Sequence, residues 1–225
     1  FFKKHAAGFR VAFDVGANKG DWTREALKIN PKLDIFAFEP DPAMCAEFKA
    51  NSFPKNVVCE NLGLGSKKEK RTLYIHKESS GMNSFVKRSL FKDNELAPRE
   101  VEITTVDIYC AGHRIEKIDF MKVDVEGFEL DVLRGAGEMV RKNKISVIQF
   151  EYGGTYLDSK VFLNDVFDFF KRAGYSFYKL MPRSAVRIKE YSPELEDFQY
   201  SNYVAMAPDY TNAHNLHPVE NSEKI

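Results

Sequence analysis

The sequence predicts an α/β fold in which a mostly parallel, seven-stranded sheet lies between two layers of helices and ends in a C-terminal antiparallel hairpin. Two observations predict this three-layer sandwich. Short apolar segments of strand length alternate with amphipathic segments of helix length, which is typical of parallel sheets with right-handed crossovers. The last two apolar segments, 175–181 and 200–206, follow one another without a convincing helix between them, so they are expected to pair antiparallel.

The alternation is clearest in the first sixty residues. Three short apolar runs are expected to form buried parallel strands, at 11–15, 34–38 and 57–60. Residues 22–29 have helical spacing. Residues 41–51 are expected to form the next helix, because Asp41 suits the N-cap and Pro42 the first helical position.

The middle of the chain is less regular. Residues 71–76 and 101–106 have the character of strands, and a polar excursion from Glu78 to Arg99 separates them. Loops of this length within a domain are often functional lids or are simply mobile. Residues 107–112 are expected to form a short helix.

The second half returns to alternating elements. Two further strands, a helix interrupted by glycines and a longer amphipathic helix are expected at 118–123, 145–150, 129–137 and 161–172. We expect residues 1–207 to form one domain and residues 208–225 a polar C-terminal tail.

Composition excludes several classes of function. The chain has 225 residues, 44% of them hydrophobic, which suits a single folded domain. Lys and Arg together number 33, as do Asp and Glu, so the formal net charge is zero and the chain lacks the basic character of nucleic-acid binders. No apolar run is long enough for a transmembrane helix. The chain does not begin with Met, which fits either one domain of a longer protein or a trimmed chain.

The cysteines indicate a reducing compartment. Cys45, Cys59 and Cys110 are widely spaced and odd in number, and they form no C-x-x-C pair. This argues against a disulfide framework or a zinc knuckle and favours reduced thiols. Residues 1–4 (FFKK) lack the apolar core of a secretory signal. A cytoplasmic location is therefore expected.

A glycine-rich turn follows the first predicted strand. Small residues from Gly16 to Gly20 would let a ligand approach the backbone, and Asp14 at the strand end suits a cationic amino group. The spacing is Gly-x-x-x-Gly and not G-x-G-x-x-G, which disfavours a dinucleotide pyrophosphate. On its own, a glycine-rich turn of this kind is most simply explained as a plain connection between a strand and a helix.

The next two strand ends carry further candidates for a nucleoside site. Glu39 ends the second strand, where a carboxylate can accept hydrogen bonds from ribose hydroxyls. After the third strand, Asn61 could hydrogen-bond to the edge of an adenine and Leu64 could form an apolar wall beside it. A plain glycine-containing turn explains these residues equally well.

Acidic residues gather at the carboxyl ends of the fourth and fifth strands. Asp124, Glu126 and Glu151 are expected at the same sheet edge, where one of them could take a proton from an acceptor hydroxyl. Together they could also hold a divalent cation, and the sequence leaves this undecided. Glu129 is assigned to the first turn of the following helix, where it favours the helix dipole. Lys122 could orient a carboxylate or be exposed.

These motifs together resemble the FkbM family of class I, Rossmann-like methyltransferases. The resemblance covers roughly residues 11–152 and rests on five blocks in the family's order, namely FDVGANKG (13–20), FEP (38–40), SGMNSF (80–85), TVD (105–107) and KVDVEGFELDVLRGA (122–136). Residues after Glu151 match little, and acceptor choice is expected to be encoded there.

The resemblance implies S-adenosylmethionine as the methyl donor and a hydroxyl of a sugar, glycan or small natural product as the acceptor. The cofactor-binding residues expected are Asp14, Gly16, Ala17, Asn18, Gly20, Glu39, Pro40, Asn61, Leu64 and Asp124. The resemblance also implies that the segment with Ser80, Met82, Asn83 and Ser84 borders the active site as a lid, and that TVD has a structural role.

Three other functions fit parts of the sequence. A NAD-dependent oxidoreductase would use a similar sheet, but the G-x-G-x-x-G motif is missing. A non-catalytic nucleoside-binding module would not need the acidic block. A nucleic-acid methyltransferase is disfavoured because Asp-Val-Glu-Gly (124–127) replaces the tetrad of amino-directed enzymes, and no basic run is interleaved with aromatic residues.

Overall fold

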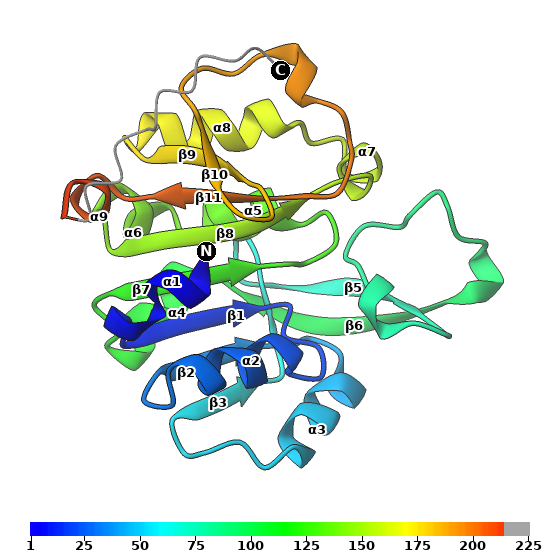
Figure 1. Ribbon diagram of the computed structural model, residues 1–225. Helices are drawn as coiled ribbons and strands as arrows, with labels where there is room; N and C mark the ends of the chain where they lie inside the picture. The colour runs from blue at the N-terminus through cyan, green and yellow to red at the C-terminus, as the bar shows by residue number, and fades with distance from the viewer. Residues whose placement is uncertain (214–225) are drawn as a thin grey trace.

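The computed structural model describes residues 1–213 (Figure 1). Within this range the main sheet has eight strands in the order β10-β9-β11-β8-β7-β1-β2-β3. The pairs β3–β2, β2–β1, β1–β7 and β7–β8 are parallel, whereas β8–β11, β11–β9 and β9–β10 are antiparallel. The strands are β1 (Val11–Val15), β2 (Asp34–Phe38), β3 (Val57–Glu60), β7 (Ile118–Val123), β8 (Ile145–Tyr152), β9 (Ser176–Leu180), β10 (Ala185–Ile188) and β11 (Ser201–Met206).

This arrangement confirms the predicted fold class. The parallel strands and the antiparallel pairing of β9 with β11 are as expected. The sheet has one strand more than predicted, because residues 185–188 pair with β9 at the sheet edge. These residues lie within a polar connection and are largely exposed, so no buried apolar pattern marked them.

Helices cover both faces of the sheet. Alternate residues of a strand point to opposite faces, and on β1 Ala12 packs with helices on one side and Phe13 with helices on the other. The first side carries α1 (Phe2–His5), α2 (Asp21–Ile29) and α3 (Pro42–Ala50). The second carries α4 (Val106–His113), α5 (Glu129–Gly135), α6 (Gly137–Arg141) and α8 (Leu163–Arg172). The result is a three-layer sandwich.

The helix beginnings follow local chemistry. Asp41 is the N-cap of α3, since its Oδ1 accepts a hydrogen bond from Ala43 N at 3.0 Å, and Pro42 occupies the first turn. Both positions are as predicted. This helix begins three residues after Glu39, so its N-terminus lies beside the predicted ribose-binding position.

The TVD block has the structural role that was expected. Thr105 caps α4 by accepting from Ile108 N at 3.0 Å. Asp107 accepts hydrogen bonds from Glu138 N and Met139 N of α6 at 2.9 and 3.0 Å. The block therefore begins one helix and fixes a second one to it.

A second, three-stranded sheet contains β4 (Gly63–Leu64), β5 (Glu69–His76) and β6 (Leu96–Thr104) in the order β4-β6-β5. The polar excursion connects β5 to β6 and includes two short 3₁₀ turns, Ser80–Met82 and Asp93–Glu95. In Figure 1 this connection lies on the side to which the arrowheads of β1 and β7 point. The carboxyl ends of the parallel strands and the excursion therefore share one side of the molecule.

The chain ends, within the described range, in α9 (Pro208–Ala213), where Thr211 is buried and donates a hydrogen bond to Ala207 O. Part of the predicted polar tail is thus helical, and residues 214–225 lie outside the described residues. Between β8 and α8 lies α7 (Thr155–Ser159). Each helix in residues 1–213 is too short or too polar to cross a bilayer.

All three cysteines are buried and free. The sulfur atoms of Cys45 and Cys59 lie 3.3 Å apart. Burial and the neighbouring Cys45 thiol raise the pKa of Cys59. Burial raises the pKa of Cys110 to about 12. Because the thiolate is the reactive form, the thiols of Cys59 and Cys110 are chemically quiet at neutral pH.

Candidate functional site

The glycine-rich turn after β1 is held between two neighbouring strand ends. Gly16 N and Ala17 N both donate to Phe38 O at the end of β2. Gly16 has a φ of +80°, and a Cβ atom placed on it would lie 1.8 Å from the carbonyl oxygen of Asp124. Only glycine fits both the left-handed backbone and this close approach. The turn therefore packs directly on the end of β7.

Glu39 fastens the same turn to the start of α3. Its carboxylate is 6% exposed and accepts hydrogen bonds from Asn18 N and Asp41 N, each at 2.8 Å. Burial is the largest influence on its pKa and raises it to about 7, although the two N–H donors favour the ionised form. Each oxygen keeps a further lone pair, so a ligand hydroxyl can still donate to Glu39.

The segment Ser80–Phe85 closes one side of the space above these strand ends. Ser80 Oγ donates to Asn18 Oδ1 at 3.2 Å, and Asn83 Nδ2 donates to Asp41 Oδ2 at 3.0 Å. Ser84 Oγ donates to the backbone oxygen of Glu126 at 2.7 Å. Three side chains of one segment thus contact three different loops of the sheet edge.

Together these loops enclose a cavity. It is lined by Val15, Gly16, Asn18, Phe38, Glu39, Pro40, Gly63, Leu64, Leu73, Ser80, Gly81, Asn83, Ser84, Phe85, Asp124, Val125 and Glu126. Glu39 and Asn18 supply polar groups, whereas Leu64 and Phe85 supply apolar walls that suit a planar base. Most of the residues predicted from sequence for cofactor and lid therefore surround one space.

Several predicted residues support the cavity without lining it. Ala17 packs against α3, and Gly20 is the N-cap of α2 with a φ of +85°. Asn61 Nδ2 donates to the carbonyl oxygens of both Glu39 and Pro40, so its side-chain amide holds the backbone at the end of β2. Met82 is 39% exposed and does not line the cavity.

Asp14 is also placed beneath the cavity. Its carboxylate is fully buried, accepts a hydrogen bond from Thr23 Oγ1 at 2.8 Å and lies 3.5 Å from Lys122 Nζ. Burial raises its pKa, against the opposing charge of Lys122. The cation that Asp14 faces here is therefore Lys122, and a contact with a ligand amino group stays a prediction.

Lys122 joins Asp14 to the acidic cluster. Its ammonium lies 3.1 Å from Asp124 Oδ2 as well as 3.5 Å from Asp14. The side chain is 15% exposed, and the two carboxylates hold its pKa above the usual value despite burial. Of the two roles considered for Lys122, the structure shows the orienting one.

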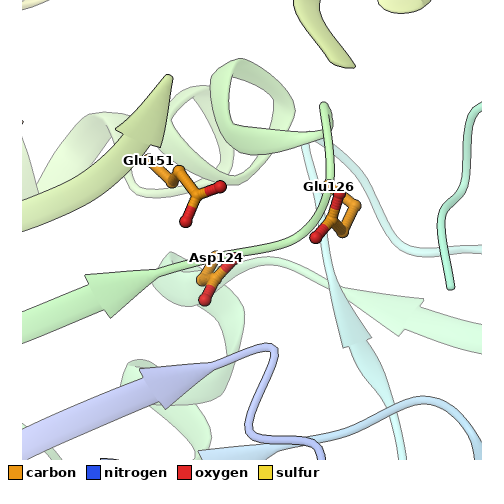
Figure 2. Close-up of side chains that lie close together, drawn as sticks. All are labelled: Asp124, Glu126 and Glu151. Carbon is orange, nitrogen blue, oxygen red and sulfur yellow. The ribbon is translucent and has the colours of Figure 1, made fainter. Parts of the chain in front are cut away.

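Asp124, Glu126 and Glu151 converge as predicted (Figure 2). One carboxylate oxygen from each lies within 4.8 Å of the others. Burial and then the charge of Asp124 raise the pKa of both Glu126 and Glu151 to about 7. Groups with a pKa near the working pH are suited to accept a proton. The same oxygen set would fit a hard divalent cation, so metal binding stays an expectation.

Glu129 shapes the loop that carries Glu126. It is 2% exposed and accepts hydrogen bonds from Val125 N and Gly127 N at 3.1 and 3.3 Å. Glu126 has a φ of +53° and Gly127 a φ of +97°, which are uncommon backbone conformations. The buried carboxylate of Glu129 therefore holds a strained turn, in agreement with its structural assignment.

Arg88, in the excursion, was not anticipated from sequence. Its Nη1 lies 3.2 Å from Glu126 Oε2, and its Nε lies 3.9 Å from Asp158 Oδ2 of α7. Ser89 fixes the same place by donating to Asp158 Oδ1 through both N and Oγ. No local sequence pattern indicates these contacts, because Arg88 and Glu126 are 38 positions apart and Ser89 and Asp158 are 69 positions apart.

Comparison with known proteins points to the same family that the motifs resemble. The family model described as Methyltransferase FkbM domain matches residues 14–177. This span contains the turn after β1, Glu39, the Ser80–Phe85 segment and the acidic cluster.

Among characterised relatives, the chain is 26% identical over 152 residues to the 2-O-methyltransferase NoeI of Sinorhizobium fredii, covering 62% of this chain and 63% of the relative. It is 27% identical over 150 residues to the hexuronic acid methyltransferase AglP of Haloferax volcanii, covering 64% of this chain and 56% of the relative. The match thus spans less than two thirds of either relative.

Among solved structures, the chain is similar to a precorrin-6Y C5,15-methyltransferase from Geobacter metallireducens. The sequences are 11% identical, and the match covers 91% of this chain and 85% of that one with a TM-score of 0.49.

Proposed function

Because the chain belongs to the FkbM family of methyltransferases, we propose that it transfers the methyl group of S-adenosylmethionine to a hydroxyl group of a sugar, glycan or small natural product. The observation that carries this proposal is the cavity between the ends of β1, β2 and β7, which is lined by Glu39 as well as by Asp124 and Glu126. Two relatives, named as a 2-O-methyltransferase and a hexuronic acid methyltransferase, support a carbohydrate acceptor.

The cavity residues fit the proposed cofactor. Glu39 can accept hydrogen bonds from ribose hydroxyls while it keeps its two backbone donors. Leu64 and Phe85 can cover the base, and Gly16 leaves the backbone open to close approach. A bound S-adenosylmethionine would supply an electrophilic methyl group on a cationic sulfur, and the carboxylates suit a neighbouring positive charge.

The acidic cluster would activate the acceptor. A hydroxyl is a weak nucleophile, so removing its proton as the new bond forms should accelerate transfer by about 10²–10⁴-fold. Glu126 and Glu151 are suited to receive that proton because each has a pKa of about 7. Asp124, held by Lys122, lies beside both. Positioning within the cavity supplies the rest of the rate increase.

Glu39→Gln is expected to weaken binding of S-adenosylmethionine by roughly 10- to 150-fold, because charge-assisted hydrogen bonds are worth about 1.5–3 kcal/mol. The amide also turns a donor toward one of the two backbone N–H groups that Glu39 now accepts. Isothermal titration calorimetry measures the change. Glu116→Gln is the matched control, because Glu116 is exposed and lies just before the start of β7, at the opposite edge of the sheet.

Calorimetry also distinguishes the proposed function from the main alternative, a NAD-dependent oxidoreductase. NAD⁺ is expected to give no heat of binding. If NAD⁺ bound and S-adenosylmethionine did not, the chain would be a nucleotide-binding protein of another kind. Unchanged affinity in Glu39→Gln would remove Glu39 from the cofactor site.

Turnover is expected to rise with pH through about 7 and then level off, because Glu126 and Glu151 have pKa values raised to about 7 and must be ionised to accept a proton. The profile of kcat/KM between pH 5.5 and 9 tests this. The raised pKa values also mean that ionisation of Glu126 and Glu151 is less favourable in the folded state than in the unfolded state. The stability that these two groups contribute is therefore fully present below about pH 4.5 and is lost as the pH rises through 7. A flat rate profile would exclude both residues as the base.

A further inference from the structure

Carboxylates gather beside the cavity: Asp124 and Glu126 line it, and Glu151 lies next to both. The side chains of Asp124, Glu126 and Glu151 lie close together in Figure 2, and Asp158 of α7 is linked to Glu126 through Arg88. An ionised carboxylate only accepts hydrogen bonds, with about four acceptor positions. This part of the site is therefore built to receive hydroxyl donors.

Two cations lie against the cluster, and each is already shared between two carboxylates. Lys122 lies between Asp14 and Asp124. Arg88 lies between Glu126 and Asp158, and its side chain is 11% exposed. An acceptor carrying its own carboxylate or phosphate would therefore meet cations whose charge protein carboxylates already balance.

From this charge arrangement we infer that the acceptor is an uncharged, hydroxyl-bearing sugar and that its anionic counterparts are disfavoured. The inference rests on the proposed transfer to a sugar hydroxyl and narrows its substrate class. It separates this chain from the relative named as a hexuronic acid methyltransferase. A neutral sugar ring offers donors to several carboxylates at once, whereas a uronate places a like charge among them.

The size of the effect follows from Coulomb's law. At an effective dielectric constant of about 20–80, a like charge about 5 Å away costs between about fourfold and a few hundredfold in an equilibrium or rate. Two or more carboxylates of the cluster would contribute, and Lys122 and Arg88 would reduce the repulsion. We expect the neutral sugar to be preferred by at least about tenfold in kcat/KM.

The test uses the full chain, saturating S-adenosylmethionine and pairs of methyl glycosides that differ only at C6. Each neutral hexopyranoside of the gluco, galacto and manno series is compared with its uronate at pH 8, where Glu126 and Glu151 are ionised. The neutral member of the pair is expected to be the better substrate. Equal or better transfer to the uronate would overturn the inference and leave the proposed function intact. Transfer to no sugar of the panel would overturn the proposed carbohydrate acceptor, and the inference with it.

A charge variant tests the cause of the preference. Glu151→Gln removes one negative charge from the cluster, so the ratio of neutral to uronate kcat/KM should fall several-fold even if both rates fall. Glu116→Gln removes the same charge from the opposite edge of the sheet and should leave the ratio unchanged. The ratio compares two substrates of one protein, so partial unfolding cancels. An unchanged ratio in Glu151→Gln would show that charge does not set the preference.

Discussion

Replacing Gly16 by alanine is expected to abolish cofactor binding and to lower the free energy of unfolding by about 3 kcal/mol or more. The φ of +80° disfavours an L-residue, and the new Cβ would lie 1.8 Å from Asp124 O. The backbone of either β1 or β7 must move to relieve this overlap. Because Gly16 and Asp124 both line the cavity, the movement would also separate cofactor-binding loops. Urea unfolding and calorimetry with S-adenosylmethionine measure the two effects.

Gly112→Ala is the control for that substitution. Gly112 lies within α4, and a Cβ atom placed there meets nothing within 4 Å. In a helix the change from glycine to alanine should stabilise the protein by about 0.5–1 kcal/mol. If Gly16→Ala behaved like this control and bound cofactor normally, close packing of the two strand ends would not be required for the site.

Asp124→Asn is expected to lower the single-turnover rate by about 10²–10⁴-fold, with a smaller effect on cofactor affinity. Asp124 holds Lys122 at 3.1 Å, and its charge contributes to the raised pKa of Glu126 and Glu151. Asparagine keeps the shape and removes the charge. The midpoint of the pH–rate profile should therefore move to lower pH in the residual activity.

Asp34→Asn controls for the loss of a carboxylate, since Asp34 is exposed at the amino end of β2. It should leave both rate and profile unchanged. A rate within threefold of the wild type for Asp124→Asn, measured at saturating cofactor and acceptor, would remove Asp124 from the catalytic machinery.

Those features of the fold that depend on local pattern were predictable from sequence. The apolar strands and the Asp41 cap follow from residues close together in the chain, whereas residues 105 and 106, expected at the end of a strand, form the cap and first position of α4. The glycine-rich turn and Glu39 were also placed at the correct edge, because parallel strands deliver their carboxyl ends together. The strand β10 was missed because its side chains are mostly exposed.

The contacts that depend on distant residues were not predictable. Arg88 reaches Glu126 only because the excursion folds back on the sheet edge. The contact of Asp14 with a ligand stays a prediction, and its pairing with Lys122, which comes from the neighbouring strand β7 and also contacts Asp124, was not anticipated. Sequence spacing indicates which strand end carries a charge, and packing decides what that charge meets.

A crystal structure of the chain with S-adenosylhomocysteine tests the central claim most directly. We expect ribose hydroxyls within about 3.2 Å of the Glu39 carboxylate, and the sulfur atom directed toward Asp124, Glu126 and Glu151. A ligand bound outside the cavity between β1, β2 and β7, or one bound there with its sulfur turned away from these carboxylates, would contradict it.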